Sequence, residues 1–578
     1  MAEKAYSAVA ETKRILDFIL GTVQIPAEAE QITKNVQLTA TRDLPYFPIP
    51  FKETELASAL KAIEGGVAGA LAATKFGTNT EPKVTVSLEK STAFLIQAYL
   101  ATVGGYGKLD KEVKNMLKAV PETDLLKAQS DPYRRMSANL YETKRGGEYY
   151  HIHGSLEAST TLGMIGLEPF RPDLKDDHDA IVDAIESHVK NYTTEELERM
   201  NAENRQAGVP VLKHENFLRT PHGKTNVSLP PWSVDNLENS TPPAPLPSTS
   251  DKRILSGVKV LELCRIIAGP VIGRILGEYG ADVLKITSPN LSDVPFFQVD
   301  GNMGKHAADL DLKTPEGRRQ FEALLAEADV VLDGYRPGAL EKLGYGATAL
   351  TKLAKDRGKG IVYVNENCFG YQGEWASRPG WQQIADCVSG VAWAQGRFMG
   401  LDEPVVPPFP ISDYGTGCMG AIAALTGLYN RATKGGSWHG KASLLQYDLL
   451  LIKVGQYPEE VRRELLKLAG DDFLALRHSH SVDQISGTAL KAMKRYAPEL
   501  FSSKEIREKW YSKGYKAEVE AVRPVVTIEG VDIGFKRASR PNGTDPASWD
   551  FGPEEDHLIE GHTNGINGTN GTNGVVKG

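Results

Sequence analysis

Two aspartates in the second half of the chain are the side chains best suited to chemistry. Asp402 lies in an L-D-E-P turn, and Asp413 lies in P-I-S-D-Y-G, directly before a run of small residues. An ionised carboxylate can act as a nucleophile or as a base. Taken alone, an aspartate in a turn before proline is typical of turn chemistry. Asp413 alone is typical of the N-cap of the helix that follows it.

Motifs for several other chemistries are missing. R-I-I-A-G-P at 265–270 follows a predicted strand but lacks the G-x-G-x-x-G of a dinucleotide site, and no G-x-S-x-G elbow occurs. The cysteines show no zinc spacing, and the His-x-His pairs at His151 and His478 lack a third ligand. We therefore expect no metal site and reduced, buried thiols. The cysteines are Cys264, Cys368, Cys387 and Cys418.

The residues after Leu255 alternate between strand and helix patterns. V-K-V-L-E-L-C, which ends at Cys264, is apolar enough for a strand buried on both faces. A helical segment follows, with Pro270 at its first position, and A-D-V-L-K-I is a second strand. A-D-V-V-L-D-G-Y and G-I-V-Y-V-N-E-N add two more strands, each after a helical segment. This alternation predicts an α/β fold with a parallel sheet and covering helices.

Five blocks of this region resemble the family III CoA-transferases, the CaiB/BaiF group that includes the α-methylacyl-CoA racemases. They occur in the family's order, and five such blocks are a specific signal. The resemblance implies a large domain with a Rossmann-like parallel sheet and a smaller α+β domain. The blocks are LSGVKVLELCRIIAGP, GADVLKI, DLDLKTPEGRRQFEALLAEADVVLDGYRPGALEKLGYG, FGYQGEWASRPGW and FPISDYGTGCMGAIAALTGLYNRATKGGSWHGKASLL.

The resemblance implies transfer of CoA from an acyl-CoA thioester to a carboxylic acid. A carboxylate attacks the thioester to give an acyl anhydride and CoA thiolate, and CoA then passes through an enzyme-bound thioester. The family's nucleophile is expected in a D-G-P-type turn after Ser-Gly. L-D-E-P lies twelve residues after Ser389-Gly390, so the resemblance nominates Asp402. Glu403 stands where the family has glycine, which departs from that pattern.

The racemase branch offers an alternative, in which bases remove and return the α-proton of a 2-methylacyl-CoA. Asp413 matches one of its aspartates, but G-W-Q (380–382) stands where that branch has a histidine and a second aspartate. A third hypothesis is a CoA-binding member of the family that has lost catalysis. We rank transfer above both.

The resemblance also indicates where CoA binds. Backbone amides at a helix start and a few cations are expected to hold its phosphates. No covalently bound cofactor is expected, because CoA is a substrate here. By position within the motifs, the binding residues are Ala268, Gly269, Lys305, Tyr335, Arg336 and Lys342.

The first half of the chain resembles the later part of the family pattern, so the sequence contains a diverged internal repeat. The segment that contains Ser87-Leu88 matches the segment that contains Ser443-Leu444. The family forms an interlocked homodimer, so one chain here could act as a monomeric pseudo-dimer; a decayed tandem duplication is the alternative. We divide the chain into a late-half region (1–227), a Pro/Ser-rich linker (228–252), a CoA-binding early-half region (253–452), a C-terminal helical closing region (453–560) and a disordered tail (561–578).

The bulk composition is that of an ordinary globular protein. The formal charge of −8 gives no electrostatic footprint for nucleic acid. No uninterrupted apolar run approaches the roughly 20 residues needed to cross a membrane. The N-terminus lacks the apolar core of a secretory signal, so we expect a cytoplasmic protein whose partners are an acyl-CoA and a carboxylic acid.

Overall fold

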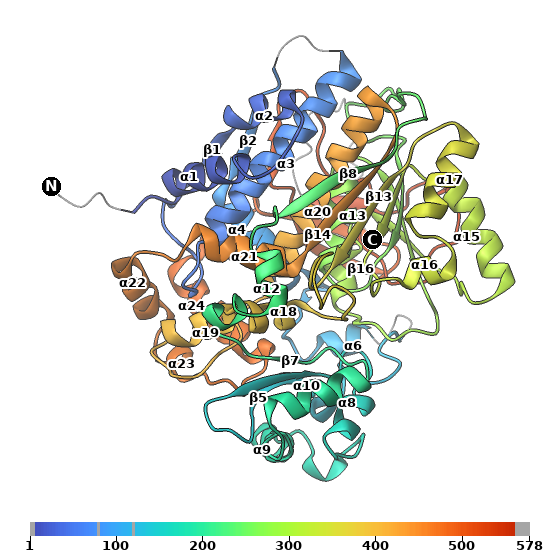
Figure 1. The fold of residues 1–578 in the computed structure, drawn as a ribbon. Coiled ribbons are helices and arrows are strands. Elements are labelled where there is room, and N and C mark those ends of the chain that lie inside the picture. Colours follow the sequence, from blue (N-terminus) through green and yellow to red (C-terminus); the bar gives the residue numbers. More distant parts are fainter. Residues whose placement is uncertain (1–5, 78–80, 118–121, 561–578) are drawn as a thin grey trace, which may run out of the picture.

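The computed structural model describes residues 6–77, 81–117 and 122–560. The predicted tail at 561–578 lies outside these residues. Within them the chain is a mixed α/β protein built around one large sheet (Figure 1).

Seven strands form the central sheet, in the order β11-β10-β9-β12-β13-β14-β8. Each of the first six pairs in parallel with its neighbours, and β8 pairs antiparallel with β14. The prediction of an α/β fold with a mostly parallel sheet is therefore confirmed. In that order the strands are Lys305–Asp309, Asp282–Thr287, Lys259–Leu263, Val330–Asp333, Val362–Asn367, Ser437–Ser443 and Trp232–Glu238.

Helices cover both faces of this sheet, which explains the continuous apolar runs of its strands. In β9, Val260 faces one core and Leu261 faces the other, and both are fully buried. Helices α13 (Ala268–Glu278) and α20 (Ile411–Lys434) pack on the first face. Helices α15 (Pro315–Glu327) and α17 (Ala347–Arg357) pack on the second. Pro270 is the third residue of α13, not the first as predicted.

The two matching segments of the sequence have the same element order. The first is α3 (Glu53–Phe76), β2 (Val84–Ser87) and α4 (Leu88–Leu95). The second is α20, β14 and α21 (Leu444–Val454). Both long helices have 24 residues, and each strand ends at a serine that caps the next helix: Ser87 accepts a hydrogen bond from the Lys90 amide, and Ser443 accepts one from the Gln446 amide.

Helix α3 is long and apolar enough to cross a membrane, judged by length and composition only. However, 94% of its apolar window is buried inside the fold. It packs against α20, so it is a core helix here.

The N-terminal and C-terminal regions interleave. Strand β2 is flanked by β1 (Gln37–Thr39) and by β17 (Val526–Ile528) from the far end of the chain. A five-stranded sheet, in the order β18-β15-β16-β3-β4, likewise combines both ends. Its strands are His557–Glu560, Arg507–Ser512, Ala517–Val522, Thr102–Val103 and Tyr106–Gly107.

A smaller α+β unit lies at the lower edge of the view in Figure 1 and has its own apolar core. It contains strands β5 (Ala138–Glu142), β6 (Tyr149–His153) and β7 (Val209–Pro210). Helices α8 (Ser159–Met164), α9 (His178–Val189) and α10 (Thr194–Glu203) cover them. The remaining helices are α1 (Ala8–Leu20), α2 (Ala27–Lys34), α5 (Gln97–Leu100), α6 (Val113–Leu117), α7 (Pro132–Arg135), α11 (His214–Phe217), α12 (Pro221–Asn226), α14 (Phe297–Gly301), α16 (Ala339–Leu343), α18 (Gln382–Ser389), α19 (Val391–Phe398), α22 (Glu459–Ala469), α23 (Asp471–Leu474), α24 (Val482–Tyr496), α25 (Glu499–Ser502) and the single 3-10 turn Pro172–Leu174.

The predicted linker at 228–252 needs a correction, because part of it is a strand. Trp232–Glu238 forms β8, the edge strand beside β14. An edge strand forms hydrogen bonds on one side only, and the prolines at 230, 231, 242 and 243 lie outside β8. The segment after β8 remains irregular.

The interleaving predicts that the halves fold together. We expect fragments 1–248 and 249–578 to show no cooperative thermal transition when purified separately, because 249–578 loses the partners of β14, β16 and β17. Co-expressed, they should form a complex with a cooperative transition by circular dichroism. A cooperative transition of 249–578 alone would contradict this.

Candidate active site

A cavity of about 420 Å³ opens at the carboxyl ends of β9, β12 and β13. From β9, the next two strands of the parallel part, β10 and β11, lie on one side, and the later strands β12, β13 and β14 lie on the other. The strand order therefore reverses between β9 and β12, and ligands of open α/β sheets bind at such a point. The floor is formed by residues that follow these strands. They are Arg265, Gly334 to Arg336, and Glu366 to Cys368.

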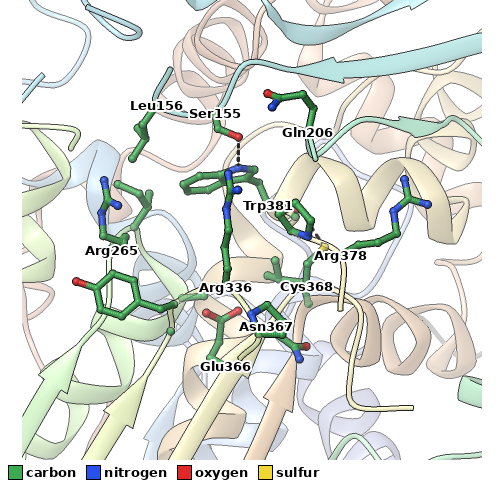
Figure 2. Close-up of a pocket in the computed structure, with 18 of the residues that line it drawn as sticks. Ser155, Leu156, Gln206, Arg265, Arg336, Glu366, Asn367, Cys368, Arg378 and Trp381 are labelled. Carbon is green, nitrogen blue, oxygen red and sulfur yellow. Dashed lines mark hydrogen bonds between the residues drawn. The ribbon is translucent and has the colours of Figure 1, made fainter. Parts of the chain in front are cut away.

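The roof of this cavity comes from the small α+β unit and from the loop before α18 (Figure 2). Trp381 donates a hydrogen bond from Nε1 to Ser155 Oγ at 2.9 Å. The His153 ring stacks on Trp381 with centroids 5.5 Å apart and planes at 4°. The site therefore lies between the small unit and the central sheet.

Asp413 lies at the junction of this cavity and a smaller one of about 80 Å³. It is the third residue of α20, and 9% of its surface is exposed. Within the described ranges no protein group donates a hydrogen bond to its carboxylate. Burial, and then the charges of Glu366 and Asp386, raise the pKa of Asp413 well above its usual range. The expectation that Asp413 caps this helix is wrong, because α20 begins at Ile411 and Pro410 is the N-cap.

Close helix packing holds Asp413 in this place. A side chain at Gly417 would bring its Cβ to 2.5 Å from Val271 Cγ1 and 2.8 Å from the Ala268 carbonyl oxygen. Two bulky residues beside the site have left-handed backbones: Ile267 with φ 45° before α13, and Phe409 with φ 67° before α20. Strained backbone of this kind is typical of functional sites.

A layer of buried acids lies behind Asp413. Asp386 accepts a hydrogen bond from Ser412 Oγ at 2.9 Å, and Asp448 accepts one from Ser389 Oγ at 3.1 Å. Burial raises the pKa of Asp386 to about 7 and that of Asp448 well above its usual range. Any negative charge in this layer makes ionisation of Asp413 harder.

Three arginines line the larger cavity, and two of them have no acidic partner within the described residues. Arg378 is engaged by Glu198, with both N–O distances at 3.1 Å. Arg265 donates to the Ser292 carbonyl oxygen. Arg336 makes no ion pair in the described structure, and partial burial together with the nearby Arg265 guanidinium lowers its pKa. Arg265 and Arg336 can therefore bind an anionic group from a ligand.

Four of the eight predicted site residues line the larger cavity. They are Ala268, Tyr335, Arg336 and Asp413.

The other four lie elsewhere. Gly269 is buried against Cys264, and an added Cβ would lie 2.7 Å from its Sγ. Lys305 is fully buried in an ion pair with Glu262 at 2.7 Å, so it cannot reach a phosphate in the cavity. Lys342 is exposed on α16, outside the cavity. Asp402 is exposed in its turn and lines neither cavity.

Sequence reasoning missed several residues of the site. Glu366 is the penultimate residue of a strand that was predicted, and the rule that ligands bind at the carboxyl ends of strands could have found it. Arg265 and Arg378 lie inside blocks that were already recognised. Nothing in the sequence signalled that His153 and Ser155 would contact Trp381.

The comparisons with known proteins agree with the family that the sequence predicts. The pattern of CoA-transferase family III matches residues 255–456. Acetyl-coenzyme A transferase nodX of Hypoxylon pulicicidum is 33% identical over 538 residues, which cover 91% of this chain and 90% of that protein. An acyl-CoA transferase of Gibberella moniliformis is 33% identical over 463 residues, which cover 79% of this chain and 80% of the relative. A crystal structure of a CAIB/BAIF family protein from Brucella suis covers 50% of this chain and 96% of its own, with 21% identity and a TM-score of 0.35.

The chain therefore belongs to CoA-transferase family III. It is an acyl-CoA transferase, as its sequence predicted.

Because burial opposes ionisation of the Asp413 carboxyl group, the stability of the fold should depend on pH. The unfolded pKa of an aspartate is about 3.9, so ionisation opposes folding increasingly as the pH rises from about 4 toward the higher folded pKa. We expect Asp413→Asn to be more stable than the parent at pH 8, by roughly 1–3 kcal/mol, with the difference vanishing near pH 4. Urea denaturation at both pH values measures this.

The matched control is Asp402→Asn, in which the exposed side chain should change stability little at either pH. Equal stability of Asp413→Asn and the parent at pH 8 would show that the carboxylate is not strained.

Proposed function

We propose that Asp413, and not Asp402, is the carboxylate that carries CoA transfer. The single observation behind this proposal is that Asp413 is an unpartnered carboxyl, within the described residues, at the junction of the two cavities, whereas Asp402 is exposed outside both. An ionised Asp413 would attack the acyl-CoA carbonyl and break the carbon–sulfur bond, which leaves an acyl aspartyl anhydride and free CoA. The CoA sulfur would then attack the aspartyl carbonyl of the anhydride and release the donor acid as a carboxylate, and the accepting acid would repeat these steps in reverse.

The larger cavity is suited to the CoA portion of the substrate. Its volume and its position at the strand ends fit an extended ligand. Arg265 and Arg336 supply positive charge for phosphate groups, and Ala268 lies at the start of α13, whose first amides have no helical partners. Tyr335 adds an aromatic wall. Lys305, Lys342 and Gly269 have no part in this proposal.

The smaller cavity is suited to the acyl group. Apolar side chains form much of its wall, with Arg135 and Asp483 among the polar ones. Its volume of about 80 Å³ is near half of the ~150 Å³ that admits benzene in an engineered protein cavity. We infer a preference for acyl groups of about two to four carbons. One relative that aligns over 90% of its length is named an acetyl-coenzyme A transferase. The apolar and aromatic lining residues are Tyr99, Leu156, Ile266, Ile267, Val294, Phe297, Trp381, Pro410 and Val482.

The site favours transfer over the alternatives. Trp381 and Gln382 stand where the racemase branch has its acid-base pair, and Trp381 is fixed by Ser155 and His153. An intact cavity with an unpartnered carboxyl is not what a decayed site would keep.

Both halves of the chain line both cavities. Residues from the first half, such as Ser155 and Tyr99, face residues from the second, such as Asp413 and Arg336. This supports a monomeric pseudo-dimer in which one polypeptide provides what two subunits provide elsewhere in the family. The homodimer and the cytoplasmic location stay predictions.

Loss of the carboxylate should abolish exchange. We expect Asp413→Asn to reduce transfer of CoA from acetyl-CoA to labelled acetate by at least about 100-fold, because no other carboxylate lines both cavities within the described chain. Hydroxylamine added during turnover should convert Asp413 to a hydroxamate, which peptide mass spectrometry locates. Asp402→Asn should keep activity and the label. A label on Asp402 would overturn the assignment.

The size of the acyl cavity predicts a chain-length preference. Across acetyl-, butyryl-, hexanoyl- and octanoyl-CoA, kcat/KM should fall beyond about four carbons. Removing the Phe297 ring from the wall should shift the optimum to longer chains in Phe297→Ala. Phe170→Ala, which truncates an exposed ring outside both cavities, is the control. A flat profile in the parent would contradict the assignment of this cavity.

A further inference from the structure

A second acid in the larger cavity has no role in the mechanism above. Glu366 is near the carboxyl end of β13, and its carboxyl group rises from the cavity floor in Figure 2. It packs over the chain after β12, since a Cβ on Gly334 would lie 3.4 Å from its Oε2. In the described part of the protein its carboxyl group has neither a hydrogen bond nor an ion pair. The unpartnered Glu366 carboxyl group is therefore placed to meet a ligand bound in this cavity.

The arrangement of the cavities decides which part of the ligand Glu366 meets. Asp413 lines both cavities, whereas Glu366 lines only the larger. With the acyl group in the smaller cavity and CoA in the larger, the carbon–sulfur bond crosses the junction and its sulfur lies on the side of Glu366. This placement rests on the function proposed above.

We propose that Glu366 is the acid-base residue for the CoA sulfur. When Asp413 attacks the thioester, the carbon–sulfur bond breaks and the electron pair goes to sulfur. The Glu366 carboxyl proton passes to that sulfur, so CoA leaves as a thiol and Glu366 becomes a carboxylate. When CoA next attacks the aspartyl carbonyl of the anhydride, Glu366 takes the thiol proton back. The donor acid leaves as a carboxylate, and no other reactant is needed.

The surroundings of Glu366 suit this exchange. Burial, and then the charge of Asp333, raise the pKa of Glu366 to about 8. A free thiol titrates near 8.5, so a proton moves between the two groups at little cost. The titratable and charged groups around Glu366 are Asp333 from β12, Cys264 directly after β9, Cys368 and Tyr371 after β13, Asp413 from α20, and Arg265, Arg336 and Arg378 in the cavity wall.

The test uses Glu366→Gln in the full chain, because glutamine keeps the shape and cannot exchange a proton with sulfur. Two small probes are compared by thiol release with hydroxylamine present to consume the anhydride: acetyl-N-acetylcysteamine, whose thiolate is about as basic as that of CoA, and acetyl thiophenol, whose thiolate is a much weaker base. We expect a loss of about 100-fold in kcat/KM for the first probe. The loss for the second should be under about 5-fold, because that thiolate leaves without a proton.

The pH profile gives a second readout that a structural role would not move. In the parent, kcat with acetyl-CoA should fall as the pH rises through about 8 and Glu366 loses its proton. This alkaline fall should be absent from Glu366→Gln. Glu374→Gln, on the exposed loop after β13, should match the parent in both assays.

The outcomes separate this inference from the function on which it rests. Equal losses for the two probes, or an alkaline fall that persists in Glu366→Gln, would overturn the role of Glu366. If Asp413→Asn releases thiol at the parent rate, the nucleophile itself is wrong. If Asp413→Asn is inactive while Glu366→Gln behaves like the parent, only the role of Glu366 fails.

Discussion

The site depends on the desolvation of one carboxylate. Helix α20 brings Asp413 to the edge of two cavities, where burial raises its pKa and no protein donor in the described residues offsets the cost. A carboxylate without such donors is a better nucleophile than one held in a hydrogen-bonded network. The close approach of α20 to α13 at Gly417 fixes this position, and the strained backbones of Ile267 and Phe409 lie on either side of it. The buried carboxylate and the strained backbones lower the stability of the fold, as is common where a site is built for reactivity.

The two halves of the chain contribute different things to this arrangement. The central sheet supplies the reversal of strand order, a helix start and the arginines of the larger cavity. The first half supplies the roof of the larger cavity and part of the smaller one through Ser155, His153 and Tyr99. Strands β2 and β17 come from opposite ends of the chain, so neither half can close the site without the other.

Asp413 and Glu366 both line the larger cavity, and their surroundings set them apart. Asp413 also meets the smaller cavity, whereas Glu366 faces only the larger one and lies near the charge of Asp333. Each acid disfavours ionisation of the other, so a single negative charge between them is the favoured state. Nucleophilic attack needs one acid ionised, and release of a thiol needs the other protonated. Two carboxyl groups whose surroundings favour different protonation states are expected to take different roles in acid-base and nucleophilic chemistry.

The sequence by itself determined the strands, the parallel sheet and the family, because these depend on local apolar patterning and on motif order. It also singled out Ala268, Tyr335, Arg336 and Asp413, which line the larger cavity, since they follow strands or lie near helix starts at one edge of the sheet. Only the tertiary structure showed that Asp413 lines both cavities while Asp402 is exposed outside them, because spacing along a loop does not say which carboxyl faces a cavity and which faces solvent. It also showed that Lys305 is neutralised by Glu262, and that a histidine from the small unit stacks on Trp381. Such contacts join residues far apart in the chain, and no local pattern encodes them.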